Sequence, residues 1–233
     1  MLSRWRQRRR VRRQNAAYRG IWEAFERYPT LADGRHDDDV WRHHSGLFAC
    51  CMIRIPLGSL DPALGELRSG LDALSVARLH ADGFLHVMLQ EIGFVTFAPV
   101  KDDEITPARF DEIRSAVGSV SKDIGPFRMS VGSANSFQDA PFLQVSDDGV
   151  CNLIHTRLRE LAAVPIVPRY PYLPHVTVGQ YVKEVDPIPT ITLLRQYRDT
   201  EFGSFKVDAI ELATLRVDIE GAPFKPNQFI RLR

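Results

Sequence analysis

Residues 85–89 read LHVML and residues 174–178 read PHVTV, and the interpretation of the chain starts from these two stretches. In each, a histidine is followed by a valine, a residue that varies and an aliphatic residue, and the two histidines, His86 and His175, are 89 positions apart. Strand side chains alternate between two faces, so the valines belong to a core face and both histidines to the opposite face. The repeat predicts two matching strands related by a pseudo-two-fold axis, as in a duplicated half.

Strand and helix patterns alternate loosely on either side of these stretches. Hairpin patterns also occur among them, which favours an α+β fold with mainly antiparallel sheets over a doubly wound parallel sheet. The predicted strands cover 47–57, 84–97, 127–137, 140–146, 172–182, 206–219 and 225–233, and the predicted helices cover 62–75, 107–124, 152–163 and 191–199.

Composition excludes several classes of protein. The 233 residues are 44% apolar, which is enough to bury a core in one large domain or two small lobes. Three cysteines, Cys50, Cys51 and Cys151, show no framework spacing and argue against a disulfide-stapled secreted protein. No stretch approaches ~18 consecutive apolar residues, and the basic start lacks the apolar segment of a secretory signal. We therefore expect a cytoplasmic protein without a membrane span.

The first 46 residues form a separate, basic extension in this interpretation, and residues 47–233 form the main domain. Residues 1–19 contain eight arginines and no acid, which leaves 22 basic against 29 acidic residues elsewhere, a formal charge of −7. Such an arm suits RNA phosphates or an anionic surface. The alternative is a mobile terminus that aids solubility or docks on the acidic body. An amphipathic helix is predicted over 15–28, with its apolar stripe on Tyr18, Ile21, Trp22 and Phe25.

Two imidazoles that face each other across a cleft suit the cleavage of a phosphodiester. One takes a proton from the attacking oxygen and the other gives a proton to the leaving oxygen, and both protonation states of histidine are accessible near neutral pH. Thr177 shares the face of His175 and can donate a hydrogen bond to a phosphate oxygen. Gln90 shares the face of His86 by strict alternation and offers a second donor. This chemistry requires no metal ion. A lone strand histidine is more often a packed residue, whereas a pair in matching strands is a stronger signal.

The arrangement resembles the two-histidine (2H) phosphoesterase superfamily, which includes bacterial 2'-5' RNA ligase-like proteins and RNA 2',3'-cyclic phosphodiesterases. The mark of that family is a pair of H-x-[ST]-x motifs, one in each lobe. The second motif is intact here as His175-Val176-Thr177-Val178, and the first reads His86-Val87-Met88-Leu89. The resemblance covers residues 47–233.

The resemblance implies two α+β lobes whose sheets form a V-shaped cleft, with the helices on the outside. It implies catalysis by His86 and His175 on 2',3'-cyclic phosphates or 2'-5' linkages of RNA or nucleotides, without a cofactor. We also expect a monomer.

Met88 departs from the family pattern because a thioether cannot donate a hydrogen bond to phosphate. One donor to a charged group contributes roughly 1.5–3 kcal/mol. The change therefore supports an alternative function, a catalytically weakened protein that binds RNA ends or nucleotides. A third hypothesis, a structural protein with incidental histidines, leaves the repeated strands unexplained.

Further candidates lie near the two motifs. Aromatic side chains at the rim could stack a base or simply pack, and arginines in or near the strands could reach a phosphate or form ion pairs. These candidates are Phe84, Tyr170, Tyr172, Arg54, Arg128 and Arg169. A metal site formed by His36, His43 and His44 with Asp37–Asp39 is disfavoured, because the spacing matches no closed tetrahedral site.

Overall fold

The structure, a computed structural model, describes residues 4–35, 43–44, 46–56, 58–60, 62–162, 171–219 and 221–233. The α-helices of these ranges are α1 (Arg4–Phe25), α3 (Ala63–Leu74), α4 (Pro107–Ala116), α5 (Val150–Arg159) and α6 (Ile188–Arg195), and the 3-10 helices are η1 (Asp82–Phe84) and η2 (Val117–Ser121). The strands are β1 (Leu47–Arg54), β2 (Ala77–Leu79), β3 (His86–Val95), β4 (Glu104–Ile105), β5 (Phe127–Ser136), β6 (Pro141–Ser146), β7 (His175–Thr177), β8 (Gly179–Tyr181), β9 (Glu201–Val207), β10 (Ala209–Arg216) and β11 (Lys225–Arg231).

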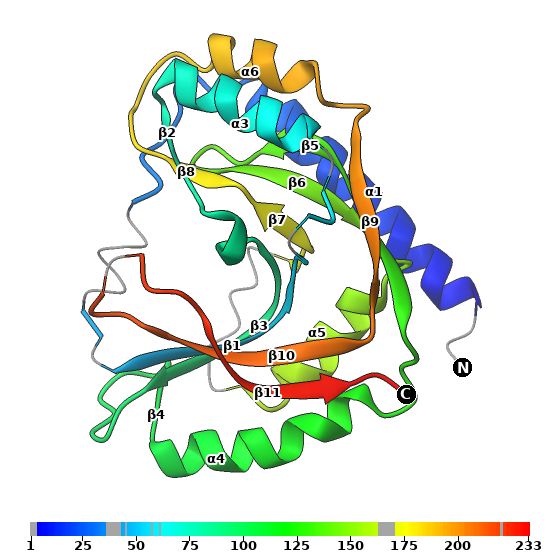
Figure 1. The fold of residues 1–233 in the computed structure, drawn as a ribbon, viewed down its shortest axis with the longest axis vertical. Helices are drawn as coiled ribbons and strands as arrows, with labels where there is room; N and C mark the ends of the chain where they lie inside the picture. The colour runs from blue at the N-terminus through cyan, green and yellow to red at the C-terminus, as the bar shows by residue number, and fades with distance from the viewer. Residues whose placement is uncertain are drawn as a thin grey trace.

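Nine of these strands form one curled sheet in the order β11-β10-β1-β3-β7-β6-β5-β9, with β4 added to β3 (Figure 1). The β3–β4 pair is parallel, and the other pairs of the sheet are antiparallel. Strands β2 and β8 form a separate antiparallel pair. The mixed, mainly antiparallel α+β fold predicted from the sequence is confirmed.

The strand order is symmetric about the contact between β3 and β7. One half runs from β1 through α3 to β3, and the other runs from β6 through α5 to β7. The two halves meet where Val87 of β3 pairs with Val176 of β7. The two expected lobes are thus halves of one continuous sheet, and the two histidine strands are direct neighbours at its centre.

The two faces of this sheet differ in character. The face of Val87, Leu143 and Val176, which we call the core face, is fully buried in a cluster that includes apolar residues of α3, α4, α5 and α6. The opposite face, which we call the histidine face, has a smaller apolar cluster around Met52 and Phe224 in the half formed by β1, β3 and β10. Burial of the core face is the main source of stability, at about 1.5–3 kcal/mol for each large side chain.

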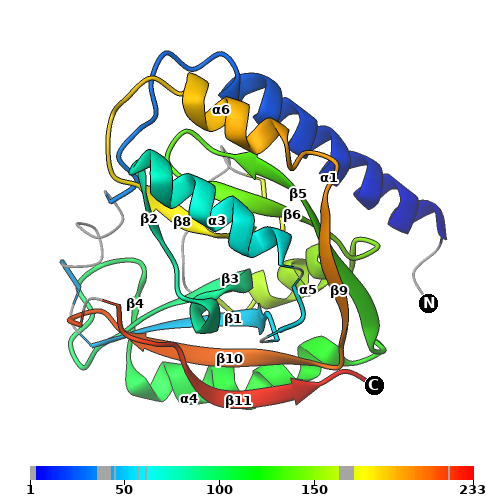
Figure 2. The same cartoon turned by 45° about the horizontal axis from the view of Figure 1, so that its top comes forward.

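Helix α1 is longer than the sequence predicted, because it begins at Arg4 and not at residue 15. It runs along the side of the molecule beside β5 and α6, and its N-terminal turns extend past β9 (Figure 2). Tyr18 and Phe25 are buried against the body, as the predicted apolar stripe requires. The boundary at residue 46 stays a prediction, although α1 packs on strands of the larger part.

The strand predicted over 172–182 is divided into β7 and β8. At Val178 the chain leaves the large sheet and turns to pair with β2, where His80 donates its N–H to the Val178 carbonyl. Gly179 permits this turn, because a Cβ there would lie 2.6 Å from the Arg78 carbonyl oxygen. Because β7 is short, side chains complete the pairing of its neighbours: Tyr172 donates to the Met88 carbonyl of β3, and Tyr18 accepts the Val145 N–H of β6.

Candidate active site

His86 and His175 lie diagonally across the pairing of β3 with β7. Because Val87 opposes Val176, one step in each direction places His86 opposite Thr177 and Met88 opposite His175. Opposed residues of an antiparallel pair share a face, so all four side chains lie on the histidine face. Diagonal neighbours of such a pair are about 7–8 Å apart. This spacing leaves room for a phosphate group between the two imidazoles.

Both imidazoles are held in the same way. His86 Nδ1 lies 2.7 Å from the Phe84 carbonyl oxygen, and His175 Nδ1 lies 2.8 Å from the Leu173 carbonyl oxygen. Each contact reaches a carbonyl two residues upstream, so the repeat seen in the sequence extends to the side-chain geometry. A carbonyl can only accept, which assigns the Nδ1 proton to both rings and leaves Nε2 as the atom that exchanges protons.

Each imidazole is also enclosed by two phenylalanine rings. His86 meets Phe84 and Phe224 edge-on, with ring centroids 5.6 and 4.9 Å apart. His175 meets Phe137 and Phe142 in the same manner, with 5.2 Å to both centroids. The rings remove water from the imidazoles and fix their orientation.

Desolvation of this kind disfavours the charged form of histidine. Burial lowers the pKa of His86 to about 4, against the opposing effect of the Phe84 carbonyl. Burial also lowers the pKa of His175, where the Leu173 carbonyl and the carboxylate of Asp139 act in the opposite direction. Both rings are therefore neutral near pH 7.

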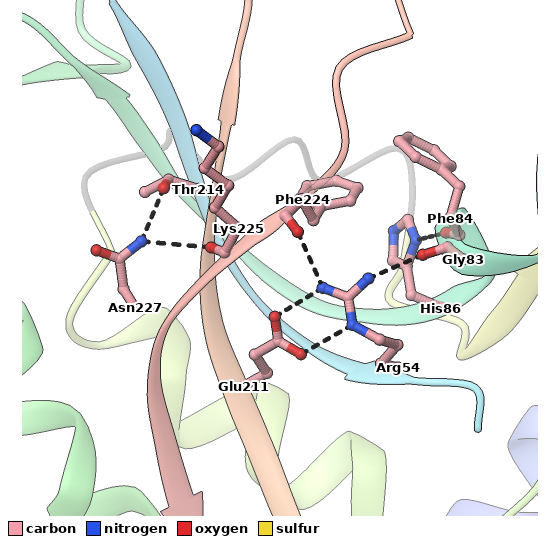
Figure 3. Close-up of polar contacts among 9 residues, drawn as sticks. All are labelled: Arg54, Gly83, Phe84, His86, Glu211, Thr214, Phe224, Lys225 and Asn227. Atoms are coloured by element: carbon pink, nitrogen blue, oxygen red, sulfur yellow. Dashed lines mark hydrogen bonds and ion pairs between the residues drawn. The ribbon is translucent and has the colours of Figure 1, made fainter. Parts of the chain in front are cut away.

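Arg54 is placed next to His86 but is already occupied. Its guanidinium donates to both carboxylate oxygens of Glu211, at 2.7 and 3.1 Å, and to the carbonyls of Gly83 and Phe224 (Figure 3). These contacts hold the two segments that carry the phenylalanine rings around His86. These contacts use donors on all three guanidinium nitrogens and favour a positioning role, and the substrate contact expected for Arg54 stays a prediction.

The prediction that Gln90 shares the face of His86 is wrong. Met52 of β1 pairs with Met88, but the next residue, Cys51, pairs with Gln90, so Leu89 is an extra residue in a β-bulge. The bulge turns Gln90 toward the side of Cys51. Its amide nitrogen donates to the Glu91 carbonyl, and its buried amide oxygen has no hydrogen-bond partner in the described part of the chain.

Tyr172 packs and does not line the histidine face. Its ring stacks on His155 with centroids 4.1 Å apart, and its hydroxyl donates to the Met88 carbonyl at 3.0 Å. Phe84 likewise packs, against His86 and Phe224. For both residues the structure favours the packing alternative that the sequence left open.

The remaining arginine and aromatic candidates lie further away or outside the described ranges. Arg128 is exposed on the histidine face and donates to the Ser204 hydroxyl. Across the sheet, His175 pairs with Gln144, and Gln144 pairs with Gly132 of β5. Arg128 lies four residues along β5 from Gly132. Four residues of a strand span about 14 Å, so Arg128 does not reach the space between the histidines. Arg169 and Tyr170 lie outside the residues that the structure describes.

The candidate metal ligands of the N-terminal region are only partly described. His36 and Asp37–Asp39 lie outside the described residues. His44 is buried, stacks on Phe94, and contacts Glu104 through Nδ1 at 3.0 Å. Within the described ranges no three His, Cys, Asp or Glu residues are grouped so that they could hold a metal ion. The three cysteines are buried and free.

Sequence reasoning missed two neighbours of His175. Gln144 of β6 pairs directly with His175 and so shares its face, as Arg54 shares that of His86. The alternation in PFLQV could have placed Gln144, had the pairing of β6 with β7 been known. Tyr18 donates to the carbonyl of Pro174, next to His175, and only the tertiary structure shows this contact.

A cavity of about 300 Å³ lies beside Arg54, where β9 ends and β10 begins. Small-molecule sites start at about this size. Its lining carries both signs of charge, since Arg231 pairs with Asp208 and Arg54 pairs with Glu211, and the ring of Phe229 at its edge is exposed. Neither histidine lines this cavity, whose link to the histidine face is Arg54.

The family model of the 2'-5' RNA ligase superfamily matches residues 59–218, which is more than half of the chain. The chain therefore belongs to this superfamily, the group of 2H phosphoesterases that the paired motifs indicated. No curated protein sequence matches the chain.

Solved structures share the fold at low sequence identity. TT0787 of Thermus thermophilus superposes with a TM-score of 0.59 and 16% identity, over 80% of this chain and 98% of that one. E. coli LigT complexed with NADP+ superposes with a TM-score of 0.53 and 17% identity, over 79% of this chain and 97% of LigT. E. coli LigT complexed with phosphate superposes with a TM-score of 0.52 and 14% identity, over 81% of this chain and 98% of LigT. The LigT-like fold thus accounts for most of this chain.

Proposed function

We propose that this protein is a metal-independent phosphoesterase that cleaves 2',3'-cyclic phosphates or 2'-5' linkages in RNA or nucleotides. The observation that carries the proposal is the matched pair of imidazoles on one face. Each has Nδ1 fixed by a carbonyl two residues upstream and Nε2 available for proton transfer. A structural role would not require the same tautomer at both positions.

His86 is assigned as the general base. Its lowered pKa keeps Nε2 unprotonated over most of the pH range, so it can take the proton of the attacking water. The water oxygen forms the new bond to phosphorus as the bond from phosphorus to the ribose oxygen breaks. His175 in its protonated form gives the Nε2 proton to that leaving oxygen. Bound phosphate anion and Asp139 both favour this protonated form.

Thr177 supports the phosphate in this scheme. It lies opposite His86 on the shared face, and its hydroxyl can donate to a non-bridging phosphate oxygen. Gln144 lies opposite His175 and can supply an amide donor from the other side. E. coli LigT, which shares the fold, has been crystallised with phosphate and with 3'-AMP, and this supports a phosphate-containing ligand for the proposed site.

A second candidate function is supported by Met88. This residue lies opposite His175, where the family pattern has a hydroxyl, so the phosphate loses a donor beside the proposed acid. A protein that binds RNA ends or nucleotides without efficient turnover would tolerate this loss. A cytoplasmic location and a monomeric state stay predictions for either function.

The test is hydrolysis of 2',3'-cyclic mononucleotides and of an oligonucleotide with a 2',3'-cyclic phosphate end, with EDTA present. Wild type, His86→Ala and His175→Ala are compared with His43→Ala, which alters an exposed histidine. General acid–base catalysis contributes about 10²–10⁴-fold, so both site variants should lose at least about a hundredfold in kcat. The proposal fails if folded His175→Ala turns over every substrate at the wild-type rate. Binding without turnover by wild type would favour the second candidate.

A further inference from the structure

We propose that α1 binds the RNA strand that leads to the phosphate end held by His86 and His175. The proposal rests on the proposed function, because it specifies a substrate with several nucleotides and not a free mononucleotide. The surface concerned, which we call the arginine face, consists of the arginines of α1 that point away from the body: Arg6, Arg8, Arg9, Arg12, Arg13 and Arg19.

The arginine face lies opposite the surface by which α1 docks. With 3.6 residues per turn, Gln14, Tyr18 and Phe25 fall on one side of the helix, and all three are buried. Arg8, Arg12 and Arg19 fall on the other side, in a line that points away from the body. The helix therefore uses its apolar side chains for docking and presents mainly charge to solvent.

Four arginines of this surface keep their charge unneutralised by any acid in the part of the chain that the structure describes. In the described part of the chain, Arg8, Arg12, Arg13 and Arg19 form no ion pair, and residues 1–19 contain no acid. Arg10 adds to the charge. Burial, followed by the positive charges of Arg6 and Arg157, lowers the pKa of Arg10, and its buried Nη1 has no hydrogen-bond partner among the described residues.

The helix is unfavourably charged for its own stability. Positive side chains at its N-terminus oppose the macrodipole, and arginines spaced three or four residues apart repel each other. A bound polyanion would relieve both effects. A basic helix on which Arg8, Arg12, Arg13 and Arg19 form no ion pair with the described residues is an arrangement expected for binding to phosphates.

Tyr18 connects this helix to the proposed catalytic strand. Its hydroxyl donates to the carbonyl of Pro174, the residue before His175, and accepts the N–H of Val145 at 3.1 Å. From Tyr18 the helix runs about 18 Å to Arg6, at 1.5 Å per residue. Helix α1 is therefore attached next to His175 through Tyr18, and its arginines extend from there over a length that suits several nucleotides.

RNA fits the arginine face better than a membrane does. A helix that lies on a lipid surface needs an apolar face directed outward. In α1 the side chains of Tyr18 and Phe25 are buried in the protein, and the large exposed apolar residue of the helix is Trp5. The ring of Trp5 is covered in part by the guanidinium of Arg9, 5.6 Å from its centroid. Charge without an apolar face favours a polyanion in solution.

The experiment compares Arg8→Gln/Arg12→Gln/Arg19→Gln with a control of equal charge, Arg109→Gln/Arg114→Gln/Arg216→Gln, made at exposed arginines elsewhere. Binding of an oligonucleotide of about 12 residues with a 3'-phosphate is measured by anisotropy against salt concentration. The same variants are assayed for turnover of a cyclic mononucleotide and for binding to phosphatidylserine vesicles.

We expect the α1 variant to bind the oligonucleotide about tenfold more weakly, and its salt slope to fall by about 2, since each phosphate contact contributes about 0.7 for single strands. Turnover of the mononucleotide should be unchanged, and the control variant should match wild type. Three outcomes would overturn the proposal. The salt slope could be unchanged in the α1 variant, or the control variant could lose as much RNA affinity as the α1 variant. The third outcome is that the α1 substitutions abolish vesicle binding and leave RNA binding unaffected. The oligonucleotide comparison is independent of turnover, so failure of the proposed reaction would be seen separately.

Discussion

Thr177 and Met88 make the proposed site asymmetric although the backbone around them is symmetric. Thr177 lies opposite His86, and Met88 lies opposite His175, on one face of the same strand pair. The loss of a hydroxyl therefore affects the side of the proposed acid and leaves the side of the proposed base intact. Met88 is half-buried and packs against the apolar cluster around Met52 and Phe224, which gives the thioether a structural use.

The substitution Met88→Thr tests the effect of this asymmetry. A hydroxyl opposite His175 adds one donor to a charged phosphate, which contributes about 1.5–3 kcal/mol, so kcat/KM for a cyclic phosphate should rise by about tenfold or more. Met52→Thr is the matched control, since Met52 packs in the same cluster but lies one strand further away. A rise in both variants, or in neither, would mean that Met88 does not limit the reaction.

His86 also makes stability depend on pH. Burial lowers its pKa to about 4, whereas the unfolded chain has the ordinary value near 6.5. Between these values the unfolded state binds more protons, so the free energy of unfolding falls as the pH falls from 6.5 to 4, by at most about 3 kcal/mol.

Urea unfolding at pH 7 and at pH 4.5 measures this effect in wild type and in His86→Asn. The variant lacks the titrating group and should lose less stability between the two pH values. An equal loss in both proteins would show that His86 is not held neutral by its surroundings.

At the scale of elements, strand alternation predicted the faces of His86 and His175 correctly and failed at Gln90. The two histidines lie in regular stretches, where period two holds. Leu89 is a bulge, and a bulge depends on how β1 pairs with β3, which a single strand sequence does not reveal. The same limit hid Gln144, whose place beside His175 follows from the pairing of β6 with β7.

The start of α1 was missed for a different reason. The arginine run was interpreted as a self-repelling tail, yet arginine is a good helix former, and local propensity alone permits a helix from Arg4. Docking of Gln14 and Tyr18 on β6 supplies free energy that offsets the repulsion. The amphipathic segment was recognisable from the sequence, but the surface that it covers was not.

Tyr18 completes the ladder between β6 and the segment before His175. Val145 is the next residue of β6 beyond the paired stretch, and the residue available to it, Pro174, has no N–H. The Tyr18 hydroxyl accepts the Val145 N–H and donates to the Pro174 carbonyl. Burial keeps this hydroxyl protonated, because it raises the pKa of Tyr18 far above its usual value, against the opposing effect of the contact with Val145.

Tyr18→Phe removes this bridge and keeps the ring. Because a buried N–H loses its partner, unfolding should become easier by about 1–3 kcal/mol, measured by urea titration. Tyr197→Phe serves as the control for a hydroxyl on another element. If the bridge also orients His175, kcat for a cyclic phosphate should fall more than KM rises. A variant with wild-type stability would show that Gln14, which donates to the Val145 carbonyl at 2.7 Å, is sufficient alone.

At the scale of the molecule, no helix within the described ranges is long and apolar enough to cross a membrane. The order of strands is symmetric about the β3–β7 contact, and α1 lies outside this repeated order. It covers Phe142 and Asn135, which oppose each other in the β5–β6 pair and both contact Tyr18. The half that carries His175 therefore depends on a segment outside the repeated unit.

This dependence predicts that residues 47–233 are less stable without residues 1–46. Removal of residues 1–46 exposes surface that Tyr18 and Phe25 now cover, at about 1.5–3 kcal/mol for each side chain. It also leaves Val145 without its partner. The truncated chain should unfold at a lower urea concentration than the full chain, or fail to fold.

A shorter deletion, of residues 1–9, removes four arginines and none of the contacts with the body that Arg10, Gln14 and Tyr18 make, so it should leave the urea midpoint within experimental error. Equal midpoints for all three chains would support the boundary at residue 46 and would make α1 a dispensable attachment. A lower midpoint for the 47–233 chain alone would place α1 within the fold. The arginines would then be a binding surface built onto an element that the site requires.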